Sequence, residues 1–312
     1  MKNTTLSKIR IFAALLLPLL LGSCLQQPSN RPSPPTTIDT IPAPSSLVVN
    51  NLVVGKINMS VGEALEQNLD VYDTKQRISK EFFVGLLPGV GLLSTGRSYL
   101  FKELDSTVVT KQYGQDEKLS VPEYAIKIAK GKEPNTYLVT SALAPGALKP
   151  TFQIPSYKLV AKGGSMLPIA LQAEDETVSY QWGTDNELLE LTFTDKSNNS
   201  TKWKFSYDKK WKNPGVFSYI LGVYGIPHNS LPCVHQRLYG PIGNQKYLPN
   251  AMTIVGTKEN KTVTVTLRYI WLKGNGLIVL WLDKDNPNNL IQQYTVAFNI
   301  PAEKVELFGE GS

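Results

Sequence analysis

One short segment gathers three side chains that could do chemistry together. Residues 227–237 read Pro-His-Asn-Ser-Leu-Pro-Cys-Val-His-Gln-Arg, and they hold both histidines of the chain, His228 and His235, together with Cys233. A thiolate beside an imidazole is a nucleophile with its general base, whereas two or three such groups around an ion are ligands for zinc or copper. On an extended backbone Cys233 and His235 point to the same side, because alternate residues of a strand share a face.

Three interpretations of this segment are open. As a catalytic site, Cys233 would act as nucleophile with His235 or His228 as its base. As a metal site, the segment lacks one or two ligands that nothing else in the sequence supplies, so we predict no metal and no cofactor. As a structural element, it is a proline-stiffened connection with one buried thiol and two surface imidazoles, which is the commoner outcome for such short clusters.

The same segment is similar in part to L,D-transpeptidases, whose motif is Ser-x-Gly-Cys-Ile/Val-Arg. Ser230, Cys233 and Val234 match that pattern. Pro232 stands at the Gly position and His235 at the Arg position, and the family's histidine lies much farther upstream than any in this chain. The resemblance implies an envelope transpeptidase with a Cys nucleophile, and the departures remove the residues by which that family is identified.

A second candidate site combines cations with an aromatic ring. Lys209, Lys210 and Lys212 surround Trp211, directly after a segment, 202–207, in which basic or polar residues alternate with aromatic ones. That alternation predicts a strand with its rings turned inward and its lysines in water. Trp211 lies beyond the alternation and is the best candidate for an exposed ring. With the lysines it could bind an anionic envelope polymer or a lipid headgroup zone.

The N-terminus has the three parts of a secretory signal peptide. Three cations precede an apolar run over residues 11–21, which is too short to span a bilayer comfortably. Residues 21–24 read Leu-Gly-Ser-Cys and resemble the lipobox of bacterial lipoproteins at every position. The resemblance implies that residues 1–23 are removed and that Cys24 becomes diacylated and usually N-acylated, for example with palmitate. The Leu25 that follows, in place of Asp, implies the outer membrane in a bacterium with two membranes.

The lipobox changes what the composition means. The chain has 312 residues, a net charge of +6 and two cysteines. Because residues 1–23 carry three cations and no acid, the mature chain keeps about half of that charge, which disfavours a nucleic-acid partner. If Cys24 is lipidated, Cys233 has no intramolecular disulfide partner, so stability must come from a hydrophobic core.

The rest of the chain divides by composition. Residues 24–46 are rich in Pro, Ser and Thr and poor in apolar groups, which predicts an extended tether between the anchor and a folded body. Residues 47–312 form a β-rich globular region. Within it, the stretch 145–155 contains Pro and Gly and marks a candidate boundary between two subdomains.

Alternation of apolar and polar residues predicts antiparallel strands along most of the globular region. Segments of period two predict a meander at 177–182, 189–194 and 202–207, a hairpin at 262–272 and 277–282, and a last strand at 290–298. Shorter strands are expected near 106–111, 124–129, 137–140 and 157–161.

The start of the globular region carries helix signals instead. Ser60-Val61-Gly62-Glu63 is a capping box that predicts a helix to about residue 69, and a second short helix is expected over 75–83. The apolar, Gly-rich segment 84–96 predicts a buried loop or a hydrophobic lid. Together these signals predict a mainly β fold: an antiparallel sandwich or open barrel, with one or two short helices near the start of the folded body.

Two functions from different classes fit these observations. The first, which the sequence favours, is a non-enzymatic, membrane-anchored envelope lipoprotein whose β-rich domain binds a ligand, an envelope polymer or another protein. The second is an envelope hydrolase or transpeptidase that uses Cys233 with His235 or His228. Neither function calls for nucleic acid or for a cofactor.

Overall fold

The computed structural model describes residues 53–59, 66–73, 77–87, 91–102, 107–113, 120–147, 154–163, 165, 167–240, 242, 245–257, 261–272 and 276–298. All of them belong to one compact unit, Thr40–Ser312. Cys24, the signal peptide and the predicted tether over 24–46 lie outside the described residues.

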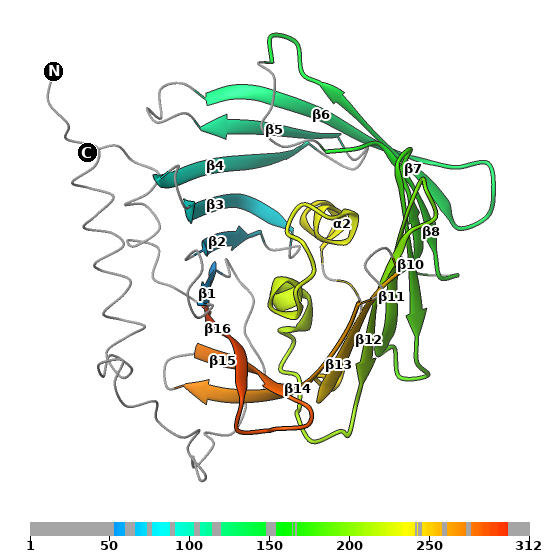
Figure 1. Cartoon of the computed structure of the whole chain (residues 1–312). Coiled ribbons are helices and arrows are strands. Elements are labelled where there is room, and N and C mark those ends of the chain that lie inside the picture. Colours follow the sequence, from blue (N-terminus) through cyan, green and yellow to red (C-terminus); the bar gives the residue numbers. More distant parts are fainter. Residues whose placement is uncertain are drawn as a thin grey trace, which may run out of the picture. The chain divides into compact units, whose positions relative to one another are not determined.

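Sixteen strands, counted over the described residues, form one antiparallel sheet (Figure 1). They are β1 (Val53–Met59), β2 (Glu66–Tyr72), β3 (Ile78–Leu87), β4 (Gly91–Lys102), β5 (Thr107–Tyr113), β6 (Ser120–Lys130), β7 (Thr136–Leu143), β8 (Tyr157–Ala161), β9 (Pro168–Gln172), β10 (Glu176–Trp182), β11 (Leu188–Asp195), β12 (Ser200–Ser206), β13 (Ala251–Gly256), β14 (Lys261–Leu272), β15 (Gly276–Asp283) and β16 (Leu290–Phe298).

Each strand pairs with the next along the chain, and β1 also pairs with β16, with Val54 opposite Phe298. The sheet therefore closes on itself as a barrel. The predicted mainly β, antiparallel fold is confirmed, and the strands predicted at 157–161 and 290–298 coincide with β8 and β16. On either side of the stretch 145–155, β7 and β8 pair with each other within this sheet.

The helices predicted near the start of the folded body are wrong in the part that the structure describes. Residues 66–72 and 78–87 are the strands β2 and β3. A capping box satisfies only the first amides of a helix, whereas β2 pairs along its whole length with β1 and β3. Within the segment 84–96, predicted as a loop or lid, residues 84–87 and 91–96 belong to the paired strands β3 and β4, in which Leu87 lies opposite Gly91.

The inner face of the barrel is apolar where the meander was predicted. Neighbouring positions on β10–β14 place one row of side chains inside the wall. This row consists of Tyr180, Leu191, Trp203, Ile254 and Val263, which are buried or half-buried and belong to or pack against the core. The period-two pattern thus forms the core because alternate residues of a strand share a face.

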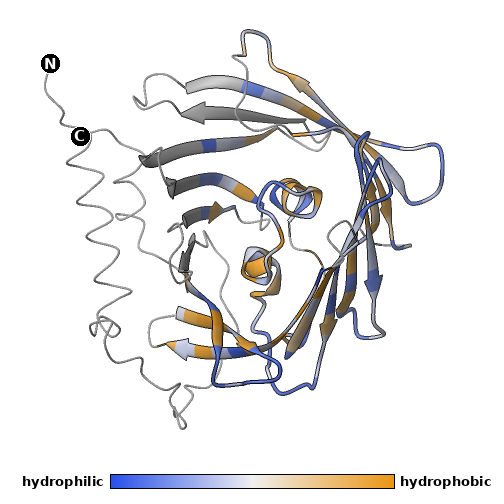
Figure 2. Cartoon of the chain, in the orientation of Figure 1, coloured by the Kyte–Doolittle hydropathy of each residue, from blue (hydrophilic) through white to orange (hydrophobic). Residues whose placement is uncertain are grey.

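The outer face of the same strands is polar, and Figure 2 shows hydrophilic and hydrophobic positions alternating along them. The corresponding outer row is Gln181, Glu190, Lys204, Thr253 and Thr264. Lys204 lies 3.9 Å from Glu190, and the two threonine hydroxyls are 3.1 Å apart. Because hydrocarbon does not solvate such groups, this row on β10–β14 is typical of a surface that faces water.

A β-bulge interrupts the alternation of inward- and outward-facing residues at the start of β11. Gln181 pairs with Glu190, but the next residue, Trp182, pairs with Leu188, so that Leu189 is an extra residue. The pattern alone groups Leu189 with the inward-facing Leu191. The structure instead buries Leu188 at 1% exposure and leaves Leu189 36% exposed.

Two helices lie inside the ring of strands (Figure 1): the 3-10 helix η2 (Phe217–Tyr224) and the α-helix α2 (Leu231–Tyr239). The side chain of Asn213 accepts hydrogen bonds from the backbone amides of residues 215–217 and so caps the start of η2. Among the described residues, no helix is long and apolar enough to cross a bilayer.

Tryptophans of the barrel wall hold the other end of η2. Trp203 donates a hydrogen bond from Nε1 to the carbonyl of Tyr224 at 3.0 Å, and Trp281 does the same to Val223 at 2.9 Å. These bonds satisfy carbonyls that a helix end leaves without a partner. Gly225 ends the helix with a φ of 74°, and a Cβ there would lie 2.9 Å from the Trp281 ring. The close contact and the backbone conformation therefore both require glycine.

Candidate functional site

A cavity of about 220 Å³ lies beside η2 and α2. Aliphatic side chains form one part of its wall: Ile78, Leu221, Val223 and Ile226. Polar side chains form another part: Asp70, Tyr72, His228, Cys233, Gln236 and Arg237. An apolar cavity with a few convergent polar groups is the usual form of a small-molecule site.

The predicted common face of Cys233 and His235 is wrong, because their segment is a helix. α2 begins after Ser230 and has Pro232 in its first turn, where proline is tolerated. Residues two apart in a helix point about 200° away from each other, whereas residues four apart share a face. Cys233 therefore faces the cavity together with Arg237, and His235 points elsewhere.

His235 joins α2 to the barrel wall. It is 2% exposed, and its Nδ1 lies 3.1 Å from the hydroxyl of Tyr157 on β8. The ring of Tyr239 packs against it, with centroids 5.1 Å apart. Burial lowers the pKa of His235 to about 4, so the imidazole is neutral at neutral pH. The residue is buried rather than at the surface, and the contact with Tyr157 fixes its orientation.

The structure brings the other two residues of the predicted cluster to one place. Cys233 forms no disulfide with any residue that the structure describes, is 8% exposed and lines the cavity. His228 lines the same cavity, and its side chain is 36% exposed. Of the two histidines, His228 is thus the one that shares a cavity with the thiol.

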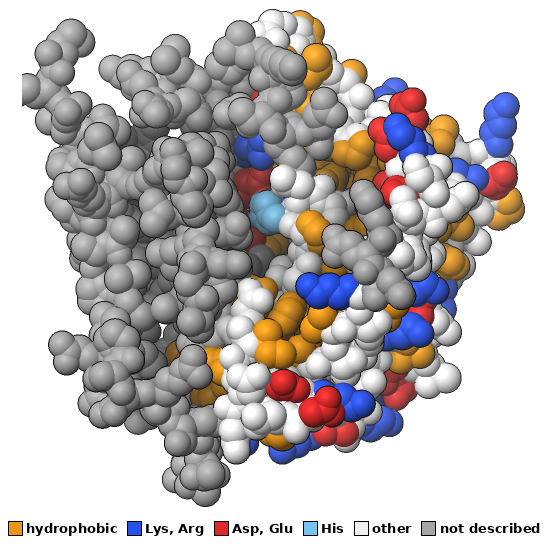
Figure 3. All heavy atoms as spheres, in the orientation of Figure 1, with side chains coloured by type: hydrophobic (Ala, Val, Ile, Leu, Met, Phe, Trp, Pro, Cys, Tyr) orange, Lys and Arg blue, Asp and Glu red, His pale blue; other side chains and the backbone are white. Residues whose placement is uncertain are grey.

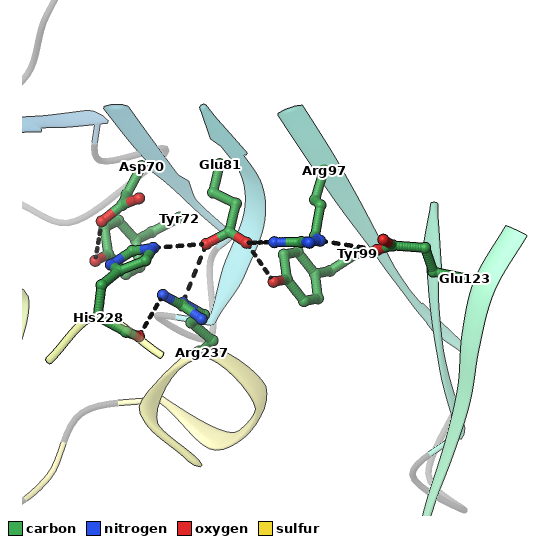
Figure 4. A network of polar contacts seen from close by, with 8 residues as sticks. All are labelled: Asp70, Tyr72, Glu81, Arg97, Tyr99, Glu123, His228 and Arg237. Atoms are coloured by element: carbon green, nitrogen blue, oxygen red, sulfur yellow. Dashed lines mark hydrogen bonds and ion pairs between the residues drawn. The ribbon is translucent and has the colours of Figure 1, made fainter. Parts of the chain in front are cut away.

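A buried charge network that the sequence did not predict lies next to this cavity (Figure 4) and is centred on Glu81 of β3. Its Oε2 lies 3.0 Å from Nε of Arg237 and 3.6 Å from Nε2 of His228. Its Oε1 accepts a hydrogen bond from the hydroxyl of Tyr99 at 2.7 Å and lies 3.4 Å from Nη1 of Arg97. One carboxylate thus ties α2 and the segment before it to the wall.

The network continues along the wall on both sides of Glu81. Arg97 of β4 donates from Nε to Oε2 of Glu123 on β6 at 2.8 Å. On β2, the hydroxyl of Tyr72 lies 3.5 Å from Oδ2 of Asp70, and both residues are 1% exposed. Figure 3 shows acidic, basic and imidazole side chains close together among apolar ones on this side of the molecule.

Electrostatic pairing sets the protonation of the network. Burial alone would raise the pKa of Glu81, but the charge of Arg237, the contacts with His228 and the charge of Arg97 hold it well below its usual range. Burial and Arg237 lower the pKa of His228, although Glu81 acts in the opposite direction. At neutral pH Glu81 is therefore an ionised carboxylate beside two guanidinium groups, and the imidazole of His228 is neutral.

The sequence contained a weak signal for these residues. Asp70 and Arg97 each stand two positions before a buried tyrosine, Tyr72 and Tyr99 respectively. A charged residue with the same strand parity as a core aromatic is expected to point inward. The signal was lost for β2 and β3 because this region was assigned to helices.

The predicted patch around Trp211 is less exposed than expected. The Trp211 ring is half-buried and packs edge-on against Tyr269, with centroids 5.6 Å apart. Lys210 lies 5.0 Å from the centre of that ring, and Lys209 is 3.9 Å from a carboxylate oxygen of Asp185. Lys212 is exposed. A binding role for this patch stays a prediction.

The described residues do not form a cluster of metal ligands. Across the described part of the chain, no three His, Cys, Asp or Glu side chains are grouped so that they could hold an ion.

Comparison with known proteins identifies no family. No protein-family model matches the chain, and no curated protein does. A porin-like protein from Bacteroides vulgatus ATCC 8482 aligns with 80% of this chain and 99% of its own, at 12% identity and a TM-score of 0.36. A porin-like protein from Bacteroides uniformis ATCC 8492 aligns with 81% and 96%, at 10% identity and a TM-score of 0.38. Similarity at this level carries no functional information.

Replacement of Glu81 by Gln should lower the free energy of unfolding by about 3–5 kcal/mol, because Arg237 and Arg97 would keep buried charges without their shared carboxylate. Denaturant unfolding measures the loss. Glu133→Gln is the matched control: this carboxylate is 68% exposed and pairs with Lys158, so the expected change is within about 1 kcal/mol. Equal losses in the two variants would contradict the central role of Glu81.

The stability of the protein should fall between about pH 6.5 and pH 4. The pKa of His235 is about 4 in the folded state and near its ordinary 6.5 in the unfolded chain, so acid adds a proton to the unfolded state first. The contribution is present above pH 6.5 and is lost as the pH falls, by at most about 1.4 kcal/mol per pH unit. His235→Gln should flatten this slope in denaturant titrations. An unchanged slope would show that His235 does not cause it.

Proposed function

We propose that this protein is a lipid-anchored, non-enzymatic protein of the bacterial cell envelope whose barrel binds a small ligand. The observation that carries the binding function is the cavity beside η2 and α2, with its aliphatic wall and its buried polar groups. Buried charges cost free energy, and four strands of the wall, β2, β3, β4 and β6, carry the charged network that reaches this space through Asp70 and Arg237. Such an arrangement is typical of a site that recognises a polar group on a ligand.

The anchor rests on the lipobox at residues 21–24. The polar outer row on β10–β14 supports it, because a wall that faces water needs another means of attachment to a membrane. In a bacterium with two membranes, Leu25 after Cys24 favours the outer membrane. Contact with an envelope polymer or a protein partner through Lys209–Lys212 is a further proposal, since the lysines there are exposed.

Loss of the lipobox cysteine should detach the protein from membranes. In cells fed radioactive palmitate, the full chain should be labelled and found in the membrane fraction, whereas Cys24→Ala should lose the label and the membrane association. Cys233→Ala is the matched control and should keep both, because Cys233 is buried in the barrel. Labelling that survives Cys24→Ala would reject the lipoprotein assignment.

The alternative function is catalysis by Cys233, and one observation favours it: the thiol shares the cavity with His228. Under the binding function, iodoacetamide should alkylate Cys233 at least about tenfold more slowly in the native protein than in urea, because the thiol is 8% exposed. Mass spectrometry measures the rate. Fast native alkylation that His228→Gln slows would favour the catalytic function, with His228 as the base.

A further inference from the structure

A buried side-chain amide on α2 lines the cavity. Gln236 is 6% exposed and lies on the same face of the helix as Cys233 and Arg237, which line the cavity with it. Its backbone carbonyl accepts a hydrogen bond from the amide of Gly240. Its side-chain amide, in contrast, forms no hydrogen bond with any residue that the structure describes.

This amide differs from the other buried polar groups that lack a partner. The hydroxyl oxygens of Tyr180, Tyr219 and Ser230 are enclosed by the surrounding packing, whereas the amide atoms of Gln236 are not. Because Gln236 is nonetheless buried and lines the cavity, its amide is open to that space. A buried polar group without a partner costs free energy, so a ligand that supplies one gains affinity.

The chemistry of an amide defines the complementary group. A glutamine side chain offers two N–H donors and one carbonyl acceptor side by side. An alcohol can satisfy one of these two ends at a time with good geometry, whereas a primary carboxamide carries the same pair of groups and can satisfy both. Two hydrogen bonds to one partner also fix the orientation of the ligand.

The charged groups around the cavity favour a neutral ligand. Arg237 lies 3.0 Å from Glu81, and Asp70 interacts with Tyr72 and is engaged beyond that contact. His228 is neutral at neutral pH. A charged ligand would compete with pairs that are already formed, while a neutral ligand needs only hydrogen bonds.

The apolar wall provides a place for a hydrocarbon chain. Leu221, Val223 and Ile226 line the cavity, whose volume is about 220 Å³. A cavity of about 150 Å³ already accommodates benzene, so a short aliphatic chain fits here. Gly222 lines the same space, and a Cβ built on it would meet no atom within 4 Å.

We propose that the cavity binds a small, neutral primary carboxamide with an aliphatic chain, in which the amide of the ligand pairs with Gln236 and the chain lies against η2. This inference rests on the proposed ligand-binding function and names the chemical class of its ligand.

Pentanamide, pentanol, pentanoate and pentylamine are matched probes, since they share a chain length and differ in the polar group. Calorimetric titration of the purified full chain at neutral pH should show binding of pentanamide in preference to the other three. Gln236→Leu, which has a similar volume and lacks both hydrogen-bonding ends, should weaken pentanamide binding about tenfold or more. Gln181→Leu is the matched control, because Gln181 is exposed on the outer face of the barrel, and it should leave binding unchanged.

A second variant tests the place of binding. Gly222→Leu puts a side chain into the open space and should abolish pentanamide binding while the folded state persists, as checked by circular dichroism. Pentanamide binding that survives both Gln236→Leu and Gly222→Leu lies elsewhere and overturns the proposal.

The outcomes separate the ligand class from the function itself. If another probe binds as well as pentanamide, and Gly222→Leu abolishes that binding, the cavity is a ligand site and the carboxamide assignment is overturned. Pentanamide binding that Gly222→Leu abolishes and Gln236→Leu leaves unchanged has the same meaning. If no probe binds, both the carboxamide assignment and the cavity as a ligand site are overturned.

Discussion

The pairing of buried charges around Glu81 is the constraint on which the site depends. A carboxylate that is 5% exposed is stable as an ion only when cations and hydrogen-bond donors surround it, and here they come from β4, from α2 and from the segment before α2. Arg237 comes from α2 and Arg97 and Tyr99 from β4, while His228 precedes α2. Loss of a charged partner would leave a buried charge without compensation, so α2 has a fixed place against the wall. The cavity is the space that this fixed packing leaves open.

Hydrogen bonds between neutral groups also hold the two helices against the barrel wall. Trp203 and Trp281 donate to carbonyls at the end of η2, and Tyr157 holds His235 of α2. These are neutral hydrogen bonds, each of which contributes about 0.5–1.5 kcal/mol. They orient the helices, whereas the ion pairs make displacement of α2 costly. A rigid inner wall of this kind favours selective binding, since a preorganised site loses less entropy when the ligand arrives.

Much of the fold could be predicted from the sequence, because period-two alternation reports directly on which face of a strand meets the core. Val178, Tyr180 and Leu191 were assigned correctly for this reason. The register could not be predicted as well: the bulge that exchanges Leu189 for Leu188 depends on pairing with β10. Pairing between distant segments also explains the wrong prediction for β2 and β3. Their local sequence favoured helices, but hydrogen bonds to neighbouring strands stabilise the extended conformation. The site was predicted only in part, since Cys233 and His228 were identified but Asp70, Glu81, Arg97 and Glu123 were not.

The sequence by itself contained the lipobox-like pattern at residues 21–24 and determined the strand pattern of the later two thirds of the chain, since both are local signals in the order of residues. Only the tertiary structure decided that β1 pairs with β16, that residues 231–239 form a helix, and that this helix separates Cys233 from His235. The physical reason is that these contacts join residues that lie far apart in the sequence. Glu81 and Arg237 are more than 150 positions apart in the sequence, and their 3.0 Å contact follows from closure of the sheet around the helices. No pattern within either segment contains that information.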